Sequence, residues 1–133
     1  MDQTWKNALS LARRAMDNAY APYSQFRVGA CLVTDTGENF TGCNIENASY
    51  GVTICAERVA LCKAVSEGHR RFALLALCSD SEQLTFPCGV CRQALSEFAP
   101  GLTIVCASRK LTDAQAFSLG ALLPHSFSKE DMV

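Results

Sequence analysis

Cys55-Ala56-Glu57 and Pro87-Cys88-Gly89-Val90-Cys91 are the two stretches around which the chain is organised. Each stands at the predicted beginning of a helix. Cys88 and Cys91 are three residues apart, so they share one face of a helical turn and can bind one metal together. With Cys55 they supply three thiolates. Three protein ligands with an open fourth position are typical of a catalytic rather than a structural zinc site.

The segments around these stretches alternate between helical and strand patterns. Trp5, Ala8, Leu9, Ala12 and Met16 recur at spacings of three and four, which predicts an amphipathic first helix. The uninterrupted apolar run FALLALC predicts a strand buried on both faces of a sheet. We expect helices over Thr4–Ala19, Cys55–Glu67 and Cys88–Phe98, and strands over Phe26–Thr34, Asn39–Cys43, Phe72–Cys78 and Thr103–Ala107.

Turn-forming residues separate these segments. Asp35–Glu38 predicts a hairpin between the first two strands, and Gly68 predicts the end of the second helix. Pro100-Gly101 turns the chain into the fourth strand. Further on we expect a short strand near Ala114–Phe117 and a helical turn at Leu119–Leu123. Because the later strands are connected through helices, the order predicts an α/β layered sheet.

The composition is that of a globular protein and argues against several functions. With 133 residues, 49% of them hydrophobic and 19% charged, we expect a single domain over residues 1–133 with a sizeable core. Twelve basic and thirteen acidic side chains give a net charge of −1, so we expect no binding to nucleic acid and favour a small, weakly charged ligand. No apolar run has the length of a membrane span, so no membrane partner is expected.

Eight cysteines are many for a chain of this length. A disulfide framework would require a secretory context, and Met1–Lys6 contains no apolar signal core. We therefore expect a reduced, cytoplasmic protein whose thiols bind metal. Five cysteines are expected to act as small hydrophobic residues without chemistry, namely Cys31, Cys43, Cys62, Cys78 and Cys106.

A closed, four-ligand zinc site is the structural alternative. Cys62 is the nearest further thiol, but it follows Cys55 by two helical turns, or about 10 Å along the axis. Two sulfurs on one zinc cannot lie more than about 4.6 Å apart, which excludes Cys62. His69 and His125 stand alone in the sequence and are more simply surface or loop histidines.

Glu57 follows Cys55 by two residues, in the first helical turn. A carboxylate there can simply complement the helix dipole, but a neighbouring metal with a free coordination position favours proton transfer. Three thiolates on Zn²⁺ leave a net charge of −1, which Arg58 could offset. The polar run Asn44-Ile45-Glu46-Asn47 is either a loop face or a grip for a ligand, and the residues alone leave both interpretations open.

In combination these features resemble the small homotetrameric cytidine deaminases, from about Trp5 to Phe127. The zinc signature of that class is Cys/His-x-Glu followed by Pro-Cys-x-x-Cys. The resemblance implies a three-layer α/β/α sandwich with a mixed central sheet of about five strands. The motifs that carry it are Ala21-Pro22-Tyr23-Ser24 with Phe26, Val28-Gly29-Ala30, Gly42-Cys43-Asn44-Ile45-Glu46-Asn47-Ala48, Cys55-Ala56-Glu57-Arg58, Pro87-Cys88-Gly89-Val90-Cys91-Arg92-Gln93, and Leu122-Leu123-Pro124 with Phe127.

The resemblance implies one Zn²⁺ per subunit on Cys55, Cys88 and Cys91, with Glu57 as the catalytic proton shuttle and Arg58 offsetting the thiolate charge. It further implies the hydrolytic deamination of cytidine and 2′-deoxycytidine to uridine and 2′-deoxyuridine, with release of ammonia, as in pyrimidine salvage. Hydroxide held by the zinc would attack C4 of the base.

The same resemblance implies which residues hold the nucleoside. Asn44 and Glu46 would bind the ribose hydroxyls, Phe26 would pack against the pyrimidine, and the Ala56 backbone would contact the base. Phe127 would reach into the site of a neighbouring subunit, so that formation of the homotetramer completes the sites.

Two other functions stay open from the sequence. A blasticidin-type deaminase would share the Cys55 site, where deaminases of tRNA adenosine, guanine or deoxycytidylate have histidine, but would hold its substrate differently. The intact Asn44–Asn47 run and Phe26 favour cytidine. A non-catalytic binding module stabilised by zinc would need a closed metal site and would unfold when the zinc is removed.

Overall fold

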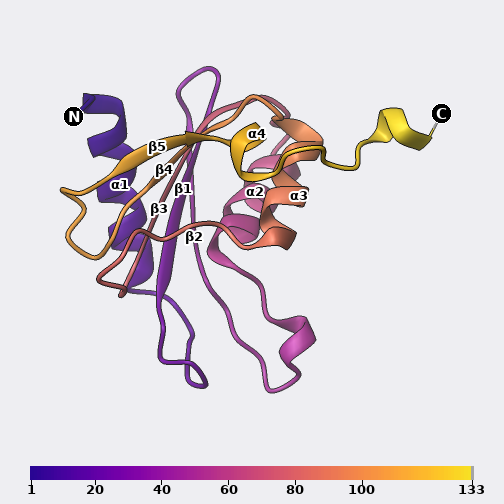
Figure 1. Cartoon of the computed structure of the whole chain (residues 1–133). Coiled ribbons are helices and arrows are strands. Elements are labelled where there is room, and N and C mark those ends of the chain that lie inside the picture. The colour runs from indigo at the N-terminus through magenta and orange to yellow at the C-terminus, as the bar shows by residue number, and fades with distance from the viewer. Residues whose placement is uncertain (133) are drawn as a thin grey trace.

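The computed structural model describes residues 1–132, and its elements follow the predicted order (Figure 1). Five strands form one sheet in the order β2-β1-β3-β4-β5, in which β3 and β4 are parallel and all other neighbours antiparallel. The helices are α1 (Gln3–Met16), α2 (Ala56–Ser66), α3 (Gly89–Phe98) and α4 (Leu119–Leu122), with 3₁₀ turns at Tyr50–Val52 and Lys129–Met132. The strands are β1 (Val28–Thr34), β2 (Asn39–Cys43), β3 (Phe72–Ser79), β4 (Thr103–Cys106) and β5 (Gln115–Ser118).

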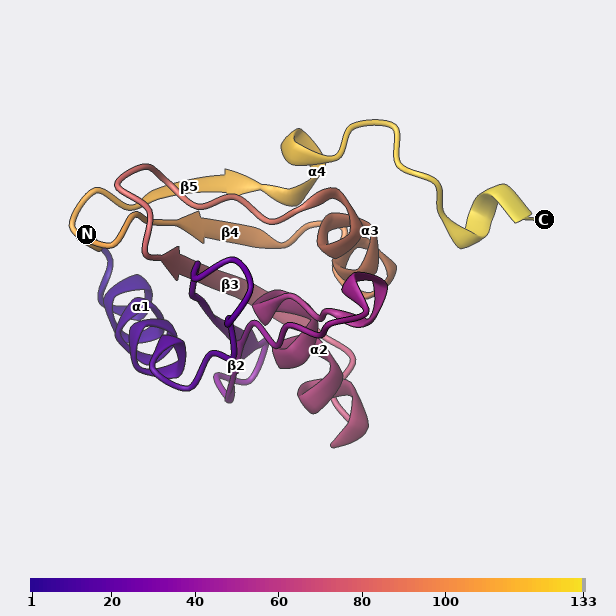
Figure 2. The same ribbon diagram turned by 90° about the horizontal axis from the view of Figure 1, so that it is seen from below.

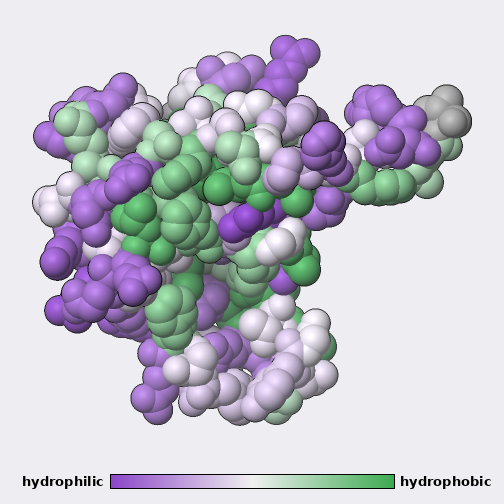
Figure 3. Space-filling model, in the orientation of Figure 1, coloured by the Kyte–Doolittle hydropathy of each residue, from purple (hydrophilic) through white to green (hydrophobic). Residues whose placement is uncertain are grey.

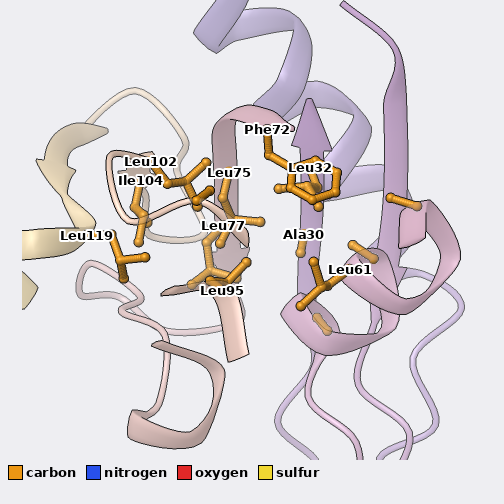
Figure 4. Close-up of a cluster of buried hydrophobic side chains, with 14 of the residues drawn as sticks. Ala30, Leu32, Leu61, Phe72, Leu75, Leu77, Leu95, Leu102, Ile104 and Leu119 are labelled. Carbon is orange, nitrogen blue, oxygen red and sulfur yellow. The ribbon is translucent and has the colours of Figure 1, made fainter. Parts of the chain in front are cut away.

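Helices cover both faces of this sheet. In Figure 1, α1 lies on one side of the strands and α2 and α3 lie on the other. The central strand β3 explains the layering, since Leu75 and Leu77 pack in the cluster beneath α2 and α3, whereas Leu74 and Ala76 pack in the cluster beneath α1. Figure 4 shows the first cluster. The predicted three-layer sandwich with a mixed sheet of five strands is therefore confirmed.

Helix α1 ends at Met16, three residues earlier than predicted. The Asp2 side chain caps its first turn by accepting a hydrogen bond from the Thr4 amide at 2.7 Å. The buried stripe also ends at Met16. Beyond it the chain turns so that Tyr20 pairs with Ile45, a contact distant in sequence that the helical periodicity cannot reveal.

Strand β1 begins two residues later than predicted, because Phe26 and Arg27 belong to the preceding loop. The Arg27 guanidinium binds the Asp80 carboxylate through two hydrogen bonds of 3.0 Å, which joins this loop to the end of β3. The remaining elements match their predicted bounds to within one residue. Gly68 has φ +98°, the left-handed conformation that commonly ends a helix, as its predicted role at the end of α2 requires.

The C-terminal segment beyond α4 extends away from the layered body (Figure 2). In the space-filling view, hydrophobic residues spread across the middle of one face, and the C-terminal segment projects from it (Figure 3). Among residues 1–132, no helix combines the length and the apolar character needed to cross a membrane.

Candidate metal centre and substrate cavity

Three thiols meet where α2 and α3 begin. Cys55 is the N-cap residue of α2 and Cys88 that of α3, so each helix begins one residue later than predicted. Neither thiol caps its own helix, so both sulfurs are free to bind a metal. Cys91 is buried in the first turn of α3. The partial positive charge of two helix N-termini favours thiolates at this place.

The distances between the sulfurs suit one tetrahedral zinc. Sγ of Cys55 lies 3.7 Å from Sγ of Cys88, which lies 3.5 Å from Sγ of Cys91, and all three sulfurs are within 4.8 Å of one another. Tetrahedral Zn–S bonds of about 2.3 Å place two sulfurs about 3.8 Å apart. Within residues 1–132 the cluster has these three members, and Cys62 is exposed elsewhere on α2. The donor set therefore fits a zinc that keeps one position for a non-protein ligand.

The electrostatic surroundings favour a thiolate at Cys55. Hydrogen bonding from Cys91, assisted by Arg58, lowers the pKa of Cys55 to about 5, although burial opposes this shift. Pairing with Cys55, together with burial, raises the pKa of Cys91. Nη2 of Arg58 lies 4.0 Å from Sγ of Cys55 and donates a hydrogen bond to the Thr53 carbonyl at 3.4 Å. Arg58 thus lies where a cation can offset thiolate charge.

Glu57 is buried next to this centre, with 4% of its surface exposed. Burial is the largest influence on its carboxyl group and raises the pKa of Glu57 to about 7. The carboxylate is not a member of the metal cluster. A carboxyl group whose pKa is near neutral can both accept and donate a proton at physiological pH.

A cavity of about 280 Å³ opens beside the thiols. This volume is slightly below the range of about 300–1,000 Å³ that is usual for ligand pockets. Its lining brings together most of the residues that the sequence predicts for a site, namely Phe26, Asn44, Glu46, Cys55, Ala56, Glu57 and Cys88. A second cavity of about 370 Å³ adjoins it and shares Ser24, Glu46 and Thr53 with it.

Asn44 is buried and joins two segments of the cavity wall. Its Oδ1 accepts a hydrogen bond from the Val28 amide at 2.9 Å, and its Nδ2 donates to the Phe26 carbonyl at 2.8 Å. One hydrogen on Nδ2 is left for a ligand. Asn44 therefore fixes the backbone of the cavity wall in addition to any role in ligand binding.

The Glu46 carboxylate is oriented by three donors from a neighbouring loop. Its Oε1 accepts hydrogen bonds from the amides of Tyr23 at 2.9 Å and Ser24 at 3.1 Å, and its Oε2 accepts one from the Ser24 hydroxyl. The Ser24 hydroxyl is the main cause that lowers the pKa of Glu46. The side chain is thus an ionised acceptor at neutral pH.

Phe127 lies apart from the cavity of its own chain. Its side chain is 61% exposed on the extended C-terminal segment, which is held by a hydrogen bond of 2.9 Å from Gln93 Nε2 to the Phe127 carbonyl. The structure therefore does not bring this predicted residue together with the others. Its predicted contact with a neighbouring subunit stays a prediction.

Sequence reasoning missed several residues of the cavity wall. Ser24, Val28, Thr53, Thr85 and Phe86 line it without having been predicted as site residues. Phe86 directly precedes Pro87 of the metal motif, so its place in the sequence was an available signal. No local pattern marks Thr53 or Thr85, which the fold brings to the cavity.

Comparison with known proteins gives a consistent result. Residues 2–108 match the family model described as "Cytidine and deoxycytidylate deaminase zinc-binding region". The chain is 46% identical to a cytidine deaminase of Sporosarcina psychrophila over 91% of this chain and 89% of that protein. It superposes on the crystal structure of a cytidine deaminase from Burkholderia pseudomallei with a TM-score of 0.89 and 43% identity, over 96% of this chain and 100% of that one. Together with the three-thiol centre, these matches show that the chain belongs to the zinc-binding cytidine deaminase family.

Proposed function

We propose that this chain catalyses the zinc-dependent hydrolytic deamination of cytidine and 2′-deoxycytidine, which yields uridine and 2′-deoxyuridine with release of ammonia. The observation that carries the proposal is the placement of buried Glu57 in one small cavity with the metal thiols Cys55 and Cys88. Membership of the cytidine deaminase family supports the choice of substrate.

Bound zinc supplies a Lewis acid that makes water nucleophilic near neutral pH. The Glu57 carboxylate accepts a proton from the attacking water and delivers it to N3 of the base as the new C4–O bond forms. The remaining proton of that water passes through Glu57 to the amine at C4, and cleavage of the C4–N bond releases ammonia and leaves a carbonyl at C4. Burial holds the Glu57 pKa near 7, so one side chain can perform both transfers.

The cavity wall offers a partner for each part of a nucleoside. The free hydrogen on Asn44 Nδ2 and a free lone pair on Glu46 Oε2 are suited to the ribose hydroxyls. Phe26, 40% exposed at the cavity, supplies an apolar face for the pyrimidine, and Ala56 lines the same cavity, where its backbone is proposed to contact the base. Arg58 offsets the charge of the thiolates.

The working form is proposed to be a homotetramer whose subunits complete one another's sites. In support, the aromatic side chains of Tyr23 and Tyr50 are exposed at the second cavity, and the C-terminal segment that carries Phe127 extends away from the layered body (Figure 2). Residues 1–133 are proposed to form a single domain that acts in the cytoplasm, in pyrimidine salvage, without nucleic-acid or membrane partners.

The decisive experiment follows the fall in ultraviolet absorbance as cytidine is deaminated by purified, zinc-loaded protein. The isosteric variant Glu57→Gln removes the proton carrier while keeping the buried shape. We expect kcat to fall by about 10²- to 10⁴-fold, the usual contribution of general acid–base catalysis, while zinc stays at about one per chain. Near-normal turnover in Glu57→Gln would contradict the shuttle role. Wild-type protein that binds zinc but leaves cytidine unchanged would contradict the substrate, and blasticidin S would be the next compound to test.

A further inference from the structure

Gly42, in the edge strand β2, lies directly beneath the first turn of α2. A methyl group at this position would place its carbon 2.3 Å from the carbonyl oxygen of Ala56 and 2.7 Å from the amide nitrogen of Ala60. Both distances are far shorter than ordinary contacts, which begin near 3.4 Å. The obstacles are backbone atoms of a helix, so no side-chain rotation can relieve the overlap.

The helical turn above Gly42 lies next to the proposed metal ligand and includes the proposed proton carrier. Ala56 stands between Cys55, a metal thiol, and Glu57, and both Ala56 and Ala60 have 0% exposure. The depth at which this turn packs on the sheet therefore sets the positions of Sγ of Cys55 and of the Glu57 carboxylate. The partner thiols Cys88 and Cys91 belong to a different helix, α3, whereas the atoms nearest to a methyl group at position 42 belong to α2.

We propose that Gly42 is a positioning residue, whose missing side chain lets the first turn of α2 approach the sheet closely enough to bring Cys55 and Glu57 into register with the thiols of α3. Its catalytic consequence rests on the proposed deaminase function, whereas its consequence for metal binding does not.

The tolerance of such a site is smaller than the displacement that a side chain would cause. Relief of a 2.3 Å contact requires α2 to move by roughly 1 Å. Metal–ligand distances in a working site hold to within about 0.2 Å, and a misplacement of about 1 Å can reduce turnover by about 10²-fold. Gly42→Ala should therefore weaken zinc binding and turnover through geometry alone.

Gly29 provides a matched control on the neighbouring strand β1. A methyl carbon there would lie 1.9 Å from the carbonyl oxygen of Ala12 in α1, on the opposite face of the sheet (Figure 1). Helix α1 carries none of the metal ligands. Gly29→Ala therefore creates an overlap at least as severe as Gly42→Ala, but against a helix that does not build the centre.

The test compares both variants with the wild type below their unfolding temperatures. Zinc affinity is measured by competition with a chromophoric chelator, and the cobalt-loaded proteins are compared by their thiolate-to-metal absorption. We expect Gly42→Ala to bind zinc at least about tenfold more weakly, with altered cobalt absorption and kcat about 10- to 100-fold lower. Gly29→Ala should lose a similar amount of stability but keep zinc affinity, the cobalt spectrum and kcat within about threefold.

Unchanged zinc affinity and cobalt absorption in Gly42→Ala would overturn the proposal, as would an equal loss of zinc affinity in Gly29→Ala. If Gly42→Ala does not fold, Ala60→Ser adds one oxygen atom to the buried side chain of the residue whose amide faces Gly42, and the same two metal readouts decide. A wild type that binds zinc but does not deaminate cytidine would contradict the proposed function alone, because both metal readouts are obtained without substrate.

Discussion

Replacement of Asn44 by alanine should destabilise the protein as well as weaken substrate binding. The side chain is 8% exposed and makes two hydrogen bonds, one from the Val28 amide and one to the Phe26 carbonyl. Truncation leaves both backbone groups without these partners. An unsatisfied buried polar group costs about 1–3 kcal/mol, so two such groups set a lower limit of about 2 kcal/mol. Partial access to water reduces the upper limit, and we expect Asn44→Ala to lower the free energy of unfolding by about 2–4 kcal/mol.

Urea unfolding at neutral pH measures this loss, and Asn47→Ala is the matched control. Oδ1 of Asn47 accepts a hydrogen bond of 2.9 Å from the Ser49 amide, but in an exposed loop. Its loss should therefore cost less than about 0.5 kcal/mol. An Asn44→Ala protein within about 0.5 kcal/mol of the wild type would refute the reasoning that these two bonds hold the cavity wall together.

Kinetics separate the structural role of Asn44 from its proposed contact with ribose. Loss of one hydrogen bond to a hydroxyl is worth about 0.5–1.5 kcal/mol. The fall in kcat/KM of Asn44→Ala should therefore be about two- to tenfold larger for cytidine than for 2′,3′-dideoxycytidine, which lacks the hydroxyls. Equal falls for both substrates would mean that Asn44 only shapes the cavity.

Two further predictions concern the metal and the pH dependence of stability. Chelation should release about one zinc per chain and abolish deamination. The helical signal in far-ultraviolet circular dichroism should persist, because buried clusters hold the helices on both faces of the sheet. Loss of that signal would favour the zinc-stabilised binding module. Hydrogen bonds from Arg27 hold the pKa of Asp80 below its ordinary value of 3.8, so the pair stabilises the fold above that pH and loses its effect as the pH falls through the lowered pKa. Asp80→Asn should lower the Tm at neutral pH by about 2–4 °C, and this difference should shrink at about pH 3; a constant difference would contradict the assignment.

Patterns local in sequence predicted most of the fold and the metal centre. The apolar run of β3 is continuous in the sequence, the stripe of α1 repeats with the helical period, and the pairing of Cys88 with Cys91 depends on one helical turn. The predicted bounds of α1 and β1 were wrong where a contact between residues distant in sequence accompanies the end of the element. The end of α1 depends on Tyr20 pairing with Ile45, and β1 starts late beside the contact of Arg27 with Asp80.

The same distinction applies to the site. Motif spacing predicted that the thiols and Glu57 lie together, as the structure places them, but the hydrogen bonds from the Ser24 loop to Glu46 join residues far apart in the chain. The packing of α2 on Gly42 is likewise a tertiary contact. A glycine in a strand predicts a bulge or a close approach of another backbone, yet only the fold shows that the approaching backbone carries Cys55.

The direction of the strands explains why the three thiols meet at one end of the sheet. Strand β2 is antiparallel to β1, and β1 is antiparallel to β3, so β2 and β3 run in the same direction although they are not neighbours. Helix α2 follows β2 and α3 follows β3, and both helices therefore begin at the same end of the sheet. Neither N-terminus has a side-chain cap, so two sets of helix N–H groups converge on one place with no carboxylate or hydroxyl from an N-cap residue. Three thiolates supply the negative charge that such a place favours. A zinc held by Cys55, Cys88 and Cys91 would join two helices that the sheet has already aligned, and for this reason we expect its removal to abolish catalysis while the fold persists.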